Sequence, residues 1–367
     1  MLQLNVVAIP PAKHLKHIRA LDGIRGLAYL LVFGHHCFST GLPSGLWPPF
    51  DRVLIGFFSY GYLGVDLFFV LSGFLITSLL LQDRAGEHYY WNFYVKRAFR
   101  ILPAFLAVIA IVRYMGMVDT RYAVISLFFV ANLALVLHVD GSQGPFWSLS
   151  VEEQFYLLWP FVVRNCSTKL LRRILFATIL IEPILRVLMV FGGHSISYYT
   201  FTRCDGLAWG ALLALQYTSN SLDEERPRWG EIAAALVGVA LFTAATMLNA
   251  NNRWRTSLTL TGCPLMFASL LSLVIERQYS VASKLFRLRM LCFFGDISYA
   301  SYLVHIYVIR AYDRIEGPLH SGFTAPFLIR ACVCLAITTA ICSASLYLFE
   351  RPVMTTRRRF LRKSLGR

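Results

Sequence analysis

Residues 19–36 read RALDGIRGLAYLLVFGHH. This stretch resembles a membrane helix, yet it carries charged groups and imidazoles, which are costly inside a bilayer and usually functional there. An α-helix turns about 100° and rises about 1.5 Å per residue, so His36 lies on the same face as Arg25, about 16 Å further along the axis. We therefore expect Asp22, Arg25 and His36 to share one stripe. Such a stripe can hold an anion at one membrane surface and carry out proton chemistry nearer the other.

The composition indicates a polytopic membrane protein. The chain has 367 residues, 57% of them hydrophobic, and apolar runs of about 20 residues, the length of a membrane span, recur along it. We predict an all-α fold with one membrane domain in the lipid bilayer, no cleavable signal and no appended soluble domain. The net charge of +15 does not indicate nucleic acid, because Lys and Arg gather in short connectors, as the positive-inside rule predicts. The eight cysteines are scattered, which supports neither a metal site nor a disulfide framework.

The apolar segments and basic connectors predict the topology. The apolar segments lie near 24–42, 55–81, 101–118, 122–139, 148–163, 171–191, 204–217, 231–248, 256–275, 290–311 and 325–349. Basic residues lie at Lys13, Lys16 and Arg19, at Lys96, Arg97 and Arg100, at Arg164, Lys169, Arg172 and Arg173, at Arg226 and Arg228, at Arg277, Lys284, Arg287 and Arg289, and in the tail. All of them can face the cytoplasm only if one segment does not cross. We expect that segment to be 122–139, lying at the outer surface or re-entering from it, which leaves about ten spans.

This topology divides the chain into three parts. They are a cytoplasmic N-terminal segment at 1–18, a membrane domain at 19–352 and a basic cytoplasmic tail at 353–367. The outer connectors are rich in small polar and aromatic residues, which suit contact with a sugar and equally suit an aromatic interfacial belt.

His36 is the candidate general base, because an imidazole can take a proton from a hydroxyl near neutral pH. The alternative is a histidine that only packs against a neighbouring helix. Arg97 and Arg100, spaced three apart, share a helix face at the cytoplasmic mouth, where their guanidinium groups suit phosphates. The alternative for this pair is a cluster that only sets membrane orientation.

The segment FWSLSVEEQFYLLWPF, residues 146–161, places carboxylates near a membrane entrance. Glu152 could orient the His36 imidazole, as carboxylates do in acyl-transfer triads, or it could take part in a capping box with Ser148. Asp66 is the other carboxylate that could orient His36. In its segment GVDLFFVLSGFLIT, Gly73 fits close helix packing.

Further residues could contact an acceptor at the outer side. Arg203 and Asp205 could bind substrate or form a local ion pair. Tyr299, Tyr302 and His305 lie roughly on one helix face, and FERP at 349–352 predicts a Glu–Arg pair and a proline stop at the end of the last span. The candidate substrate-binding residues are Trp147, Ser148, Arg203, Asp205, Tyr299 and His305.

Together these residues resemble the acyltransferase-3 family of integral-membrane acyltransferases. The matching blocks, in the family's order, are LDGIRGLAYLLVFGHH, GVDLFFVLSGFLIT, KRAFRILPAF, WSLSVEEQFYLLWP, RCDGLAWGALLAL, ISYASYLVH and FERP. The resemblance implies transfer of an acyl group, commonly acetyl, from cytoplasmic acyl-CoA to a hydroxyl of a glycan or lipid-linked saccharide at the outer face of the bacterial inner membrane. It places the family's Arg-x10-His pattern on Arg25 and His36, its Arg-x2-Arg pattern on Arg97 and Arg100, and the acid of its SL-x-VE pattern on Glu152.

We therefore expect Arg25, Arg97 and Arg100 to bind the CoA phosphates, and His36 to deprotonate the acceptor, oriented by Glu152 or Asp66. Acyl-CoA is expected as a co-substrate, with no permanently bound cofactor. A proton-coupled transporter or flippase for a lipid-linked sugar would use a similar Arg, His and acid set. A sensor or scaffold that binds CoA or a glycan without turnover is a third possibility.

Overall fold

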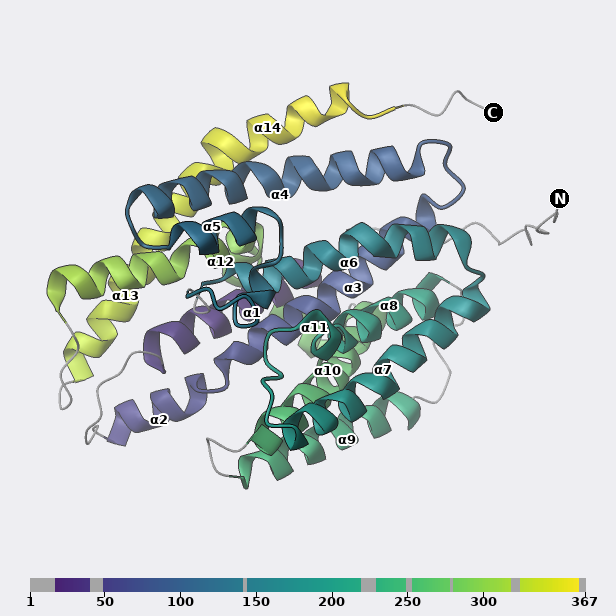
Figure 1. Ribbon diagram of the computed structural model, residues 1–367, viewed down its shortest axis with the longest axis horizontal. Coiled ribbons are helices and arrows are strands. Elements are labelled where there is room, and N and C mark those ends of the chain that lie inside the picture. Colours follow the sequence, from purple (N-terminus) through teal and green to yellow (C-terminus); the bar gives the residue numbers. More distant parts are fainter. Residues whose placement is uncertain are drawn as a thin grey trace.

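The computed structural model describes residues 17–39, 49–140, 144–218, 229–248, 253–277, 280–317 and 324–362, and within these ranges it is all-α (Figure 1). The α-helices are α1 (Arg19–Phe38), α2 (Pro49–Phe58), α3 (Gly64–Gln82), α4 (Tyr89–Tyr114), α5 (Thr120–Leu127), α6 (Phe146–Asn165), α7 (Thr168–Phe191), α8 (Asp205–Thr218), α9 (Trp229–Thr246), α10 (Arg253–Glu276), α11 (Val281–Phe286), α12 (Arg289–Glu316), α13 (Thr324–Ser345) and α14 (Arg351–Thr356). The predicted all-α class is therefore confirmed.

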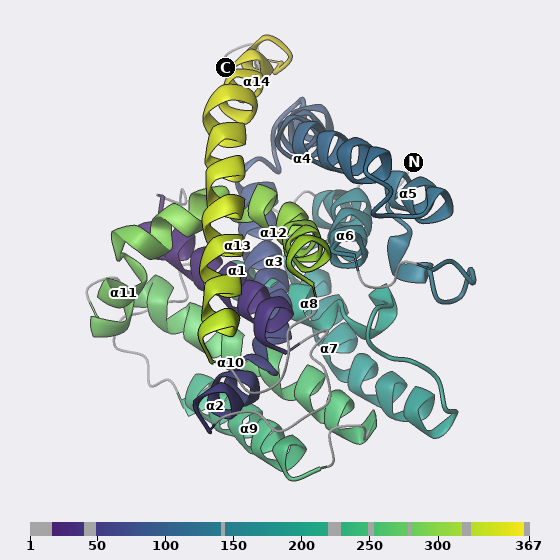
Figure 2. The same ribbon diagram turned by 90° about the vertical axis from the view of Figure 1, so that its left-hand side faces the viewer.

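The centre of the bundle is formed by α1, α3, α8 and α12, with α1 packed on α12 and α3 packed on α8 (Figure 2). Around this centre, α4 and α6 lie on one side, and α7, α9 and α10 lie on another. The α13 helix packs on α12. Residues 19–36 thus lie on a central helix, α1, where the charged stripe is shielded from lipid by the surrounding helices.

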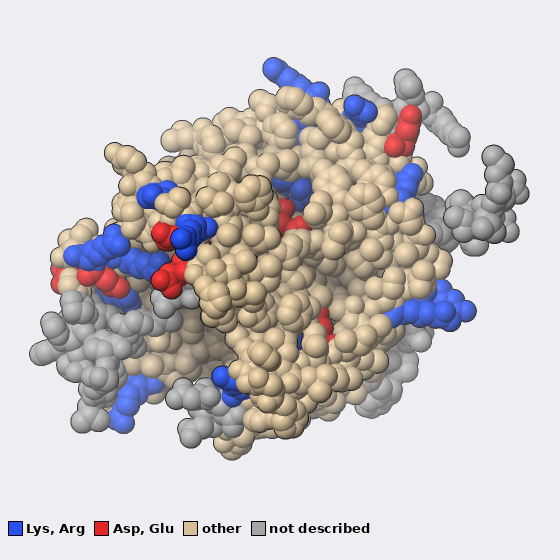
Figure 3. All heavy atoms as spheres, viewed as in Figure 1, with Lys and Arg blue, Asp and Glu red and all other residues tan. Residues whose placement is uncertain are grey.

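Five described segments are long and apolar enough to cross a membrane. They are Pro49–Gln82, Thr168–Phe191, Arg253–Glu276, Arg289–Glu316 and Phe327–Arg359. The helices α1, α4 and α6 also have spanning length, with 20, 26 and 20 residues. Charged side chains gather toward the two ends of the face drawn in Figure 3, and most of its middle is uncharged. The protein is a polytopic membrane protein, and the count of ten spans stays a prediction.

The sequence predicted that the segment 122–139 does not cross the membrane, and in the structure this segment forms no helix of spanning length. Only α5, with eight residues, and a short 3-10 turn at Ala131–Leu133 are helical there. Phe129 and His138 have positive φ values of 54° and 50°, which interrupt helical geometry. The segment packs on the start of α6, where Gln154 Nε2 donates to Phe129 O at 2.8 Å.

Hydrogen bonds hold three basic parts of the chain at one end of the bundle. Between the α3–α4 and α6–α7 connectors, Arg84 Nη2 donates to Cys166 O at 2.5 Å, and Arg164 Nη1 donates to Arg84 O. Trp91 Nε1, at the start of α4, donates to Phe360 O near the chain end at 2.8 Å. This common end agrees with the prediction that the basic connectors lie on one side of the membrane. Lys13, Lys16, Arg226 and Arg228, also used in that prediction, lie outside the described residues.

Close backbone contact fixes the position of the stripe on α1. A Cβ added at Gly26 would lie 2.0 Å from Leu291 O, and one added at Gly295 would lie 1.9 Å from Asp22 O. At Gly73 it would lie 2.0 Å from Leu207 O, which confirms the expected packing role of that glycine. Only glycine permits these approaches, so α1 is locked against α12, and α3 against α8.

The prediction for the FERP block was wrong in two respects. The last long helix does not stop at Pro352: a π-helical turn at Leu346–Glu350 leads into α14. Pro352 lies in the first turn of α14. A proline is tolerated there, because a backbone N–H in the first turn has no partner within the helix. Glu350 accepts from Ser345 Oγ at 3.0 Å, whereas Arg351 stacks 4.3 Å from the Tyr347 ring, so the expected Glu–Arg pair is absent.

Candidate active site

A cavity of about 360 Å³ lies between α1, α3, α4, α6 and α12. Its polar and charged lining comes from helices far apart in the sequence. The lining includes Arg25, Ser72, Gln82, Arg97, Arg100, Ser148, Glu152, Tyr156, Ser298, Tyr299 and Tyr302. The cavity therefore unites most of the residues that the sequence singled out.

Three arginines form the basic part of this cavity. Arg25 comes from α1, and Arg97 and Arg100 come from α4. The Arg97 guanidinium lies 4.7 Å from the centre of the Tyr156 ring, which orients it by a cation–π contact. One carboxylate, Glu152, faces these three guanidinium groups in the cavity. The excess of positive charge favours a polyanionic ligand.

Glu152 belongs to the cavity and does not cap a helix. The α6 helix begins at Phe146 with Pro145 at its cap and no capping side chain, so Glu152 lies beyond the first turn and the capping-box alternative is wrong. Its Oε1 accepts a hydrogen bond of 2.6 Å from Ser72 Oγ. The residue links α6 to α3 beside the arginines.

Two tyrosines of α12 and one serine of α6 also line the cavity. Ser148 Oγ and Tyr302 OH lie 2.5 Å apart, and Tyr299 OH donates to Ile101 O at 2.9 Å. His305 follows on the same helix but lies fully buried behind Tyr302, with the two rings 5.9 Å apart.

His36 is not among the residues that line the cavity. Its Nδ1 is 3.0 Å from Val32 O and 3.1 Å from His305 Nε2. His305 thus occupies the side of the imidazole where the sequence led us to expect a carboxylate. The neighbouring His35 places its Nδ1 3.0 Å from Phe58 O.

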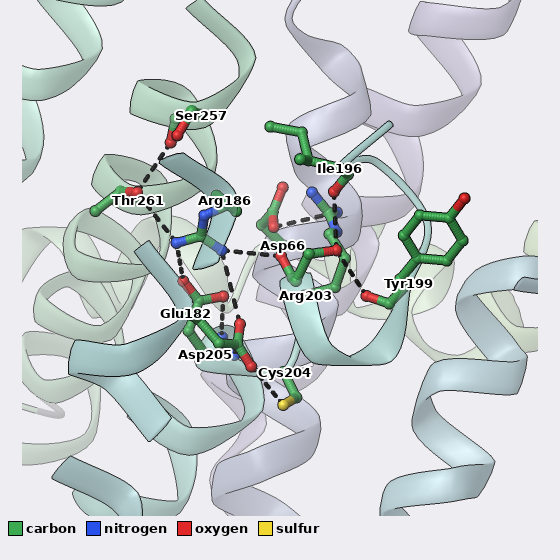
Figure 4. Close-up of polar contacts among 12 residues, drawn as sticks. Asp66, Glu182, Arg186, Ile196, Tyr199, Arg203, Cys204, Asp205, Ser257 and Thr261 are labelled. Atoms are coloured by element: carbon green, nitrogen blue, oxygen red, sulfur yellow. Dashed lines mark hydrogen bonds and ion pairs between the residues drawn. The ribbon is translucent and has the colours of Figure 1, made fainter. Parts of the chain in front are cut away.

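Asp66, Arg203 and Asp205 belong to a separate buried network (Figure 4). Asp66 pairs with Arg203 at 3.2 Å, and Asp205 pairs with Arg186 at 2.6 Å. In place of the local Arg203–Asp205 pair that the sequence suggested, one pair joins α3 to the segment before α8 and the other joins α7 to α8. Asp66 is held by Arg203 and joins α3 to the segment before α8.

Two further members of this network, Glu182 and Arg186, were not predicted from the sequence. Glu182 and Arg186 lie four residues apart on α7, and Glu182 Oε2 accepts from the Asp205 backbone N–H at 2.9 Å. An acid and a base four residues apart within the apolar segment 171–191 were the available signal.

Trp147 lies between the two regions. The Arg203 guanidinium is 5.4 Å from the Trp147 ring and 5.6 Å from the Phe69 ring. Phe69 also lines the cavity. The described residues contain no group of three or more His, Cys, Asp and Glu that could hold a metal ion.

Comparison with known proteins shows a family to which this chain is similar. The model of the acyltransferase-3 family, described as an acyltransferase domain, matches residues 18–347. The chain is 28% identical to the peptidoglycan O-acetyltransferase OatA of Listeria monocytogenes over 92% of this chain and 56% of that protein. A putative O-acetyltransferase of Staphylococcus aureus is 27% identical, over 81% of this chain and 51% of the relative.

A putative peptidoglycan O-acetyltransferase of Bacillus subtilis, YrhL, is 32% identical over 58% of this chain and 36% of its own length. The chain spans about half the length of the first two relatives. No solved structure matches the chain. The likeness therefore concerns the membrane part described here.

Proposed function

We propose, because this chain belongs to the acyltransferase-3 family, that it transfers an acetyl group from acetyl-CoA to a hydroxyl of a glycan. The observation that carries the proposal is the cavity in which Arg25, Arg97 and Arg100 meet Glu152 inside a membrane helix bundle. Guanidinium groups bind phosphates through paired hydrogen bonds, and CoA carries several phosphates.

The donor would enter at the basic end of the bundle. The phosphates would bind the three arginines, and the pantetheine arm would extend into the cavity toward Ser148 and Tyr302. The distance of about 16 Å from Arg25 to His36 along α1 is comparable to the reach of an extended arm. We place Glu152, hydrogen-bonded to Ser72, on the donor side of the reaction.

His36 would act as the general base. Its imidazole would take the proton of the acceptor hydroxyl while the hydroxyl oxygen forms a bond to the thioester carbonyl carbon. The carbon–sulfur bond would then break, and the thiolate of CoA would leave and take up a proton. Asp66 is held by Arg203, so we assign it to the architecture of the outer side.

The names of the relatives support a proposal for the acceptor class. Two of them are named for O-acetylation of peptidoglycan, so peptidoglycan or a related cell-wall glycan is the acceptor we propose. Trp147, next to the buried Arg203, would offer an aromatic surface to a sugar at the outer side. With both termini in the cytoplasm, donor and acceptor would approach His36 from opposite sides of the bacterial inner membrane.

The test is release of free CoA thiol from acetyl-CoA by the purified protein, measured with and without a peptidoglycan fragment. Release that depends on the fragment supports acetyl transfer. Binding of acetyl-CoA without release would contradict it and favour a sensor. Movement of a lipid-linked saccharide without thiol release would favour a transporter.

A further inference from the structure

We infer that His305 positions the catalytic base: it holds His36 in the tautomer whose Nε2 carries a lone pair. This inference rests on the proposed function, in which His36 removes a proton from the acceptor hydroxyl. It assigns to His305 a role inside the protein in place of the substrate contact that its sequence position suggested.

The hydrogen bonds of His305 determine its own tautomer. Its Nδ1 lies 3.0 Å from Ser301 O and 2.8 Å from Tyr302 O. Carbonyl oxygens only accept, so Nδ1 must carry the hydrogen. In the neutral imidazole the other nitrogen, Nε2, is then an acceptor.

The same reasoning carries over to His36. Its Nδ1 lies 3.1 Å from the accepting Nε2 of His305 and 3.0 Å from Val32 O. Both neighbours are acceptors, so Nδ1 of His36 must be the donor. A neutral His36 then has its lone pair on Nε2, which is the form that a general base needs.

Packing keeps His305 in this orientation. Its side chain is fully buried, the Tyr29 ring lies edge-on 6.0 Å away, and the Phe33 ring lies at 6.3 Å. Both aromatic residues belong to α1, the helix that carries His36. The α1–α12 contact therefore fixes the two imidazoles relative to one another.

The pair also has a function during the reaction. When Nε2 of His36 takes the hydroxyl proton, the ring becomes positively charged and its Nδ1–H strengthens its hydrogen bonds to His305 Nε2 and Val32 O. A neutral imidazole and a carbonyl thus orient the base and stabilise its charged form, as a carboxylate does in acyl-transfer triads. No proton leaves the pair in this step.

The test compares substitutions of His305 in purified protein. His305→Ala should lower the rate of acetyl transfer roughly 10- to 100-fold, the loss expected for one hydrogen bond to a charged group, and leave the affinity for CoA unchanged. His305→Gln places an amide oxygen near the position of Nε2 and should recover a large part of that loss. Ile309→Ala, one turn further along α12 and also buried, is the packing control and should keep the wild-type rate per folded molecule.

Nitrogen-15 NMR of histidine-labelled wild-type protein gives a readout that a purely structural role would not produce. His36 and His305 should each show a hydrogen on Nδ1 and none on Nε2, with signals assigned by loss in His36→Gln and His305→Gln. A hydrogen on Nε2 of either ring would overturn the inference, even if His305→Ala does not fold.

The outcomes separate this inference from the function beneath it. If His36→Ala abolishes transfer but His305→Ala transfers at the wild-type rate, the inference fails and the proposed base stands. Equal rates for His305→Ala and His305→Gln would overturn the hydrogen-bond role. Transfer by His36→Ala would remove the proposed base, and the role of His305 with it.

Discussion

Arg25 and His36 share one face of α1 but lie in different surroundings. Arg25 lines the cavity with Arg97 and Arg100, whereas His36 is not part of the lining and contacts His305. The periodicity of the sequence was enough to predict the common face. It could not predict that a histidine 269 residues away would meet His36, because that contact depends on how α12 crosses α1.

The two arginines of α4, Arg97 and Arg100, give a testable prediction. Arg97→Ala combined with Arg100→Ala should weaken CoA binding by about 1.5–3 kcal/mol for each charged hydrogen bond lost. Arg→Lys at both positions should restore only part of the affinity, because an ammonium lacks the planar fork. Calorimetric titration with CoA measures both effects.

Lys96 provides the matched control for these arginines. It lies in the same basic run but pairs with Asp83 at 3.0 Å and does not line the cavity. Lys96→Ala should therefore bind CoA as the wild type does. Unchanged affinity in the double arginine variant, or an equal loss in Lys96→Ala, would contradict the phosphate role of the pair.

Among the elements, the two helix pairs α1–α12 and α3–α8 depend on glycines at backbone contacts. The sequence showed these glycines, and for Gly73 it indicated close packing. The π-helical turn at Leu346–Glu350 could not be predicted, because its local sequence is compatible with a continuous α-helix. The non-spanning segment 122–139 was predictable because the charges of the connectors constrain the number of crossings.

Gly26 tests the contact between α1 and α12. Gly26→Ala places a Cβ 2.0 Å from Leu291 O, so the helices must separate, and overpacking of this kind costs about 1–3 kcal/mol. We expect a lower thermal midpoint and reduced transfer. Gly56→Ala, where a Cβ meets no atom within 4 Å, should leave both unchanged. A midpoint for Gly26→Ala equal to that of Gly56→Ala would show that the backbones are not in contact.

Over the whole molecule, the buried network of Asp66, Glu182, Arg186, Arg203 and Asp205 joins α3, α7 and α8. Asp66, Arg203 and Asp205 were identified from the sequence, but their pairing was not. The pairs Asp66–Arg203 and Arg186–Asp205 join parts of the chain that are far apart in the sequence, and several pairings satisfy the same charges. The cavity could not be predicted from the sequence for the same reason, because its lining residues come from five helices that are spread along the chain.

The topology gives a prediction that is independent of the family. In a background depleted of cysteine, single cysteines at Ser142 and Asn251, which lie outside the described residues, should react with a membrane-impermeant maleimide added from outside. Cysteines at Lys169 and Lys284, in basic connectors, should react only after the membrane is opened. Labelling at Lys169 from outside would contradict the common cytoplasmic side of the basic connectors.

The central claim is that this helix bundle transfers acetyl groups with His36 as the base. The most direct measurement is the transfer of radiolabelled acetyl from acetyl-CoA to a peptidoglycan fragment by purified wild-type, His36→Ala and His35→Ala proteins, each first shown to be folded and to bind CoA. We predict labelled glycan with the wild type and with His35→Ala, and at least a hundredfold less, roughly the contribution of a general base, with His36→Ala. Labelled glycan at the wild-type rate from His36→Ala would contradict the account.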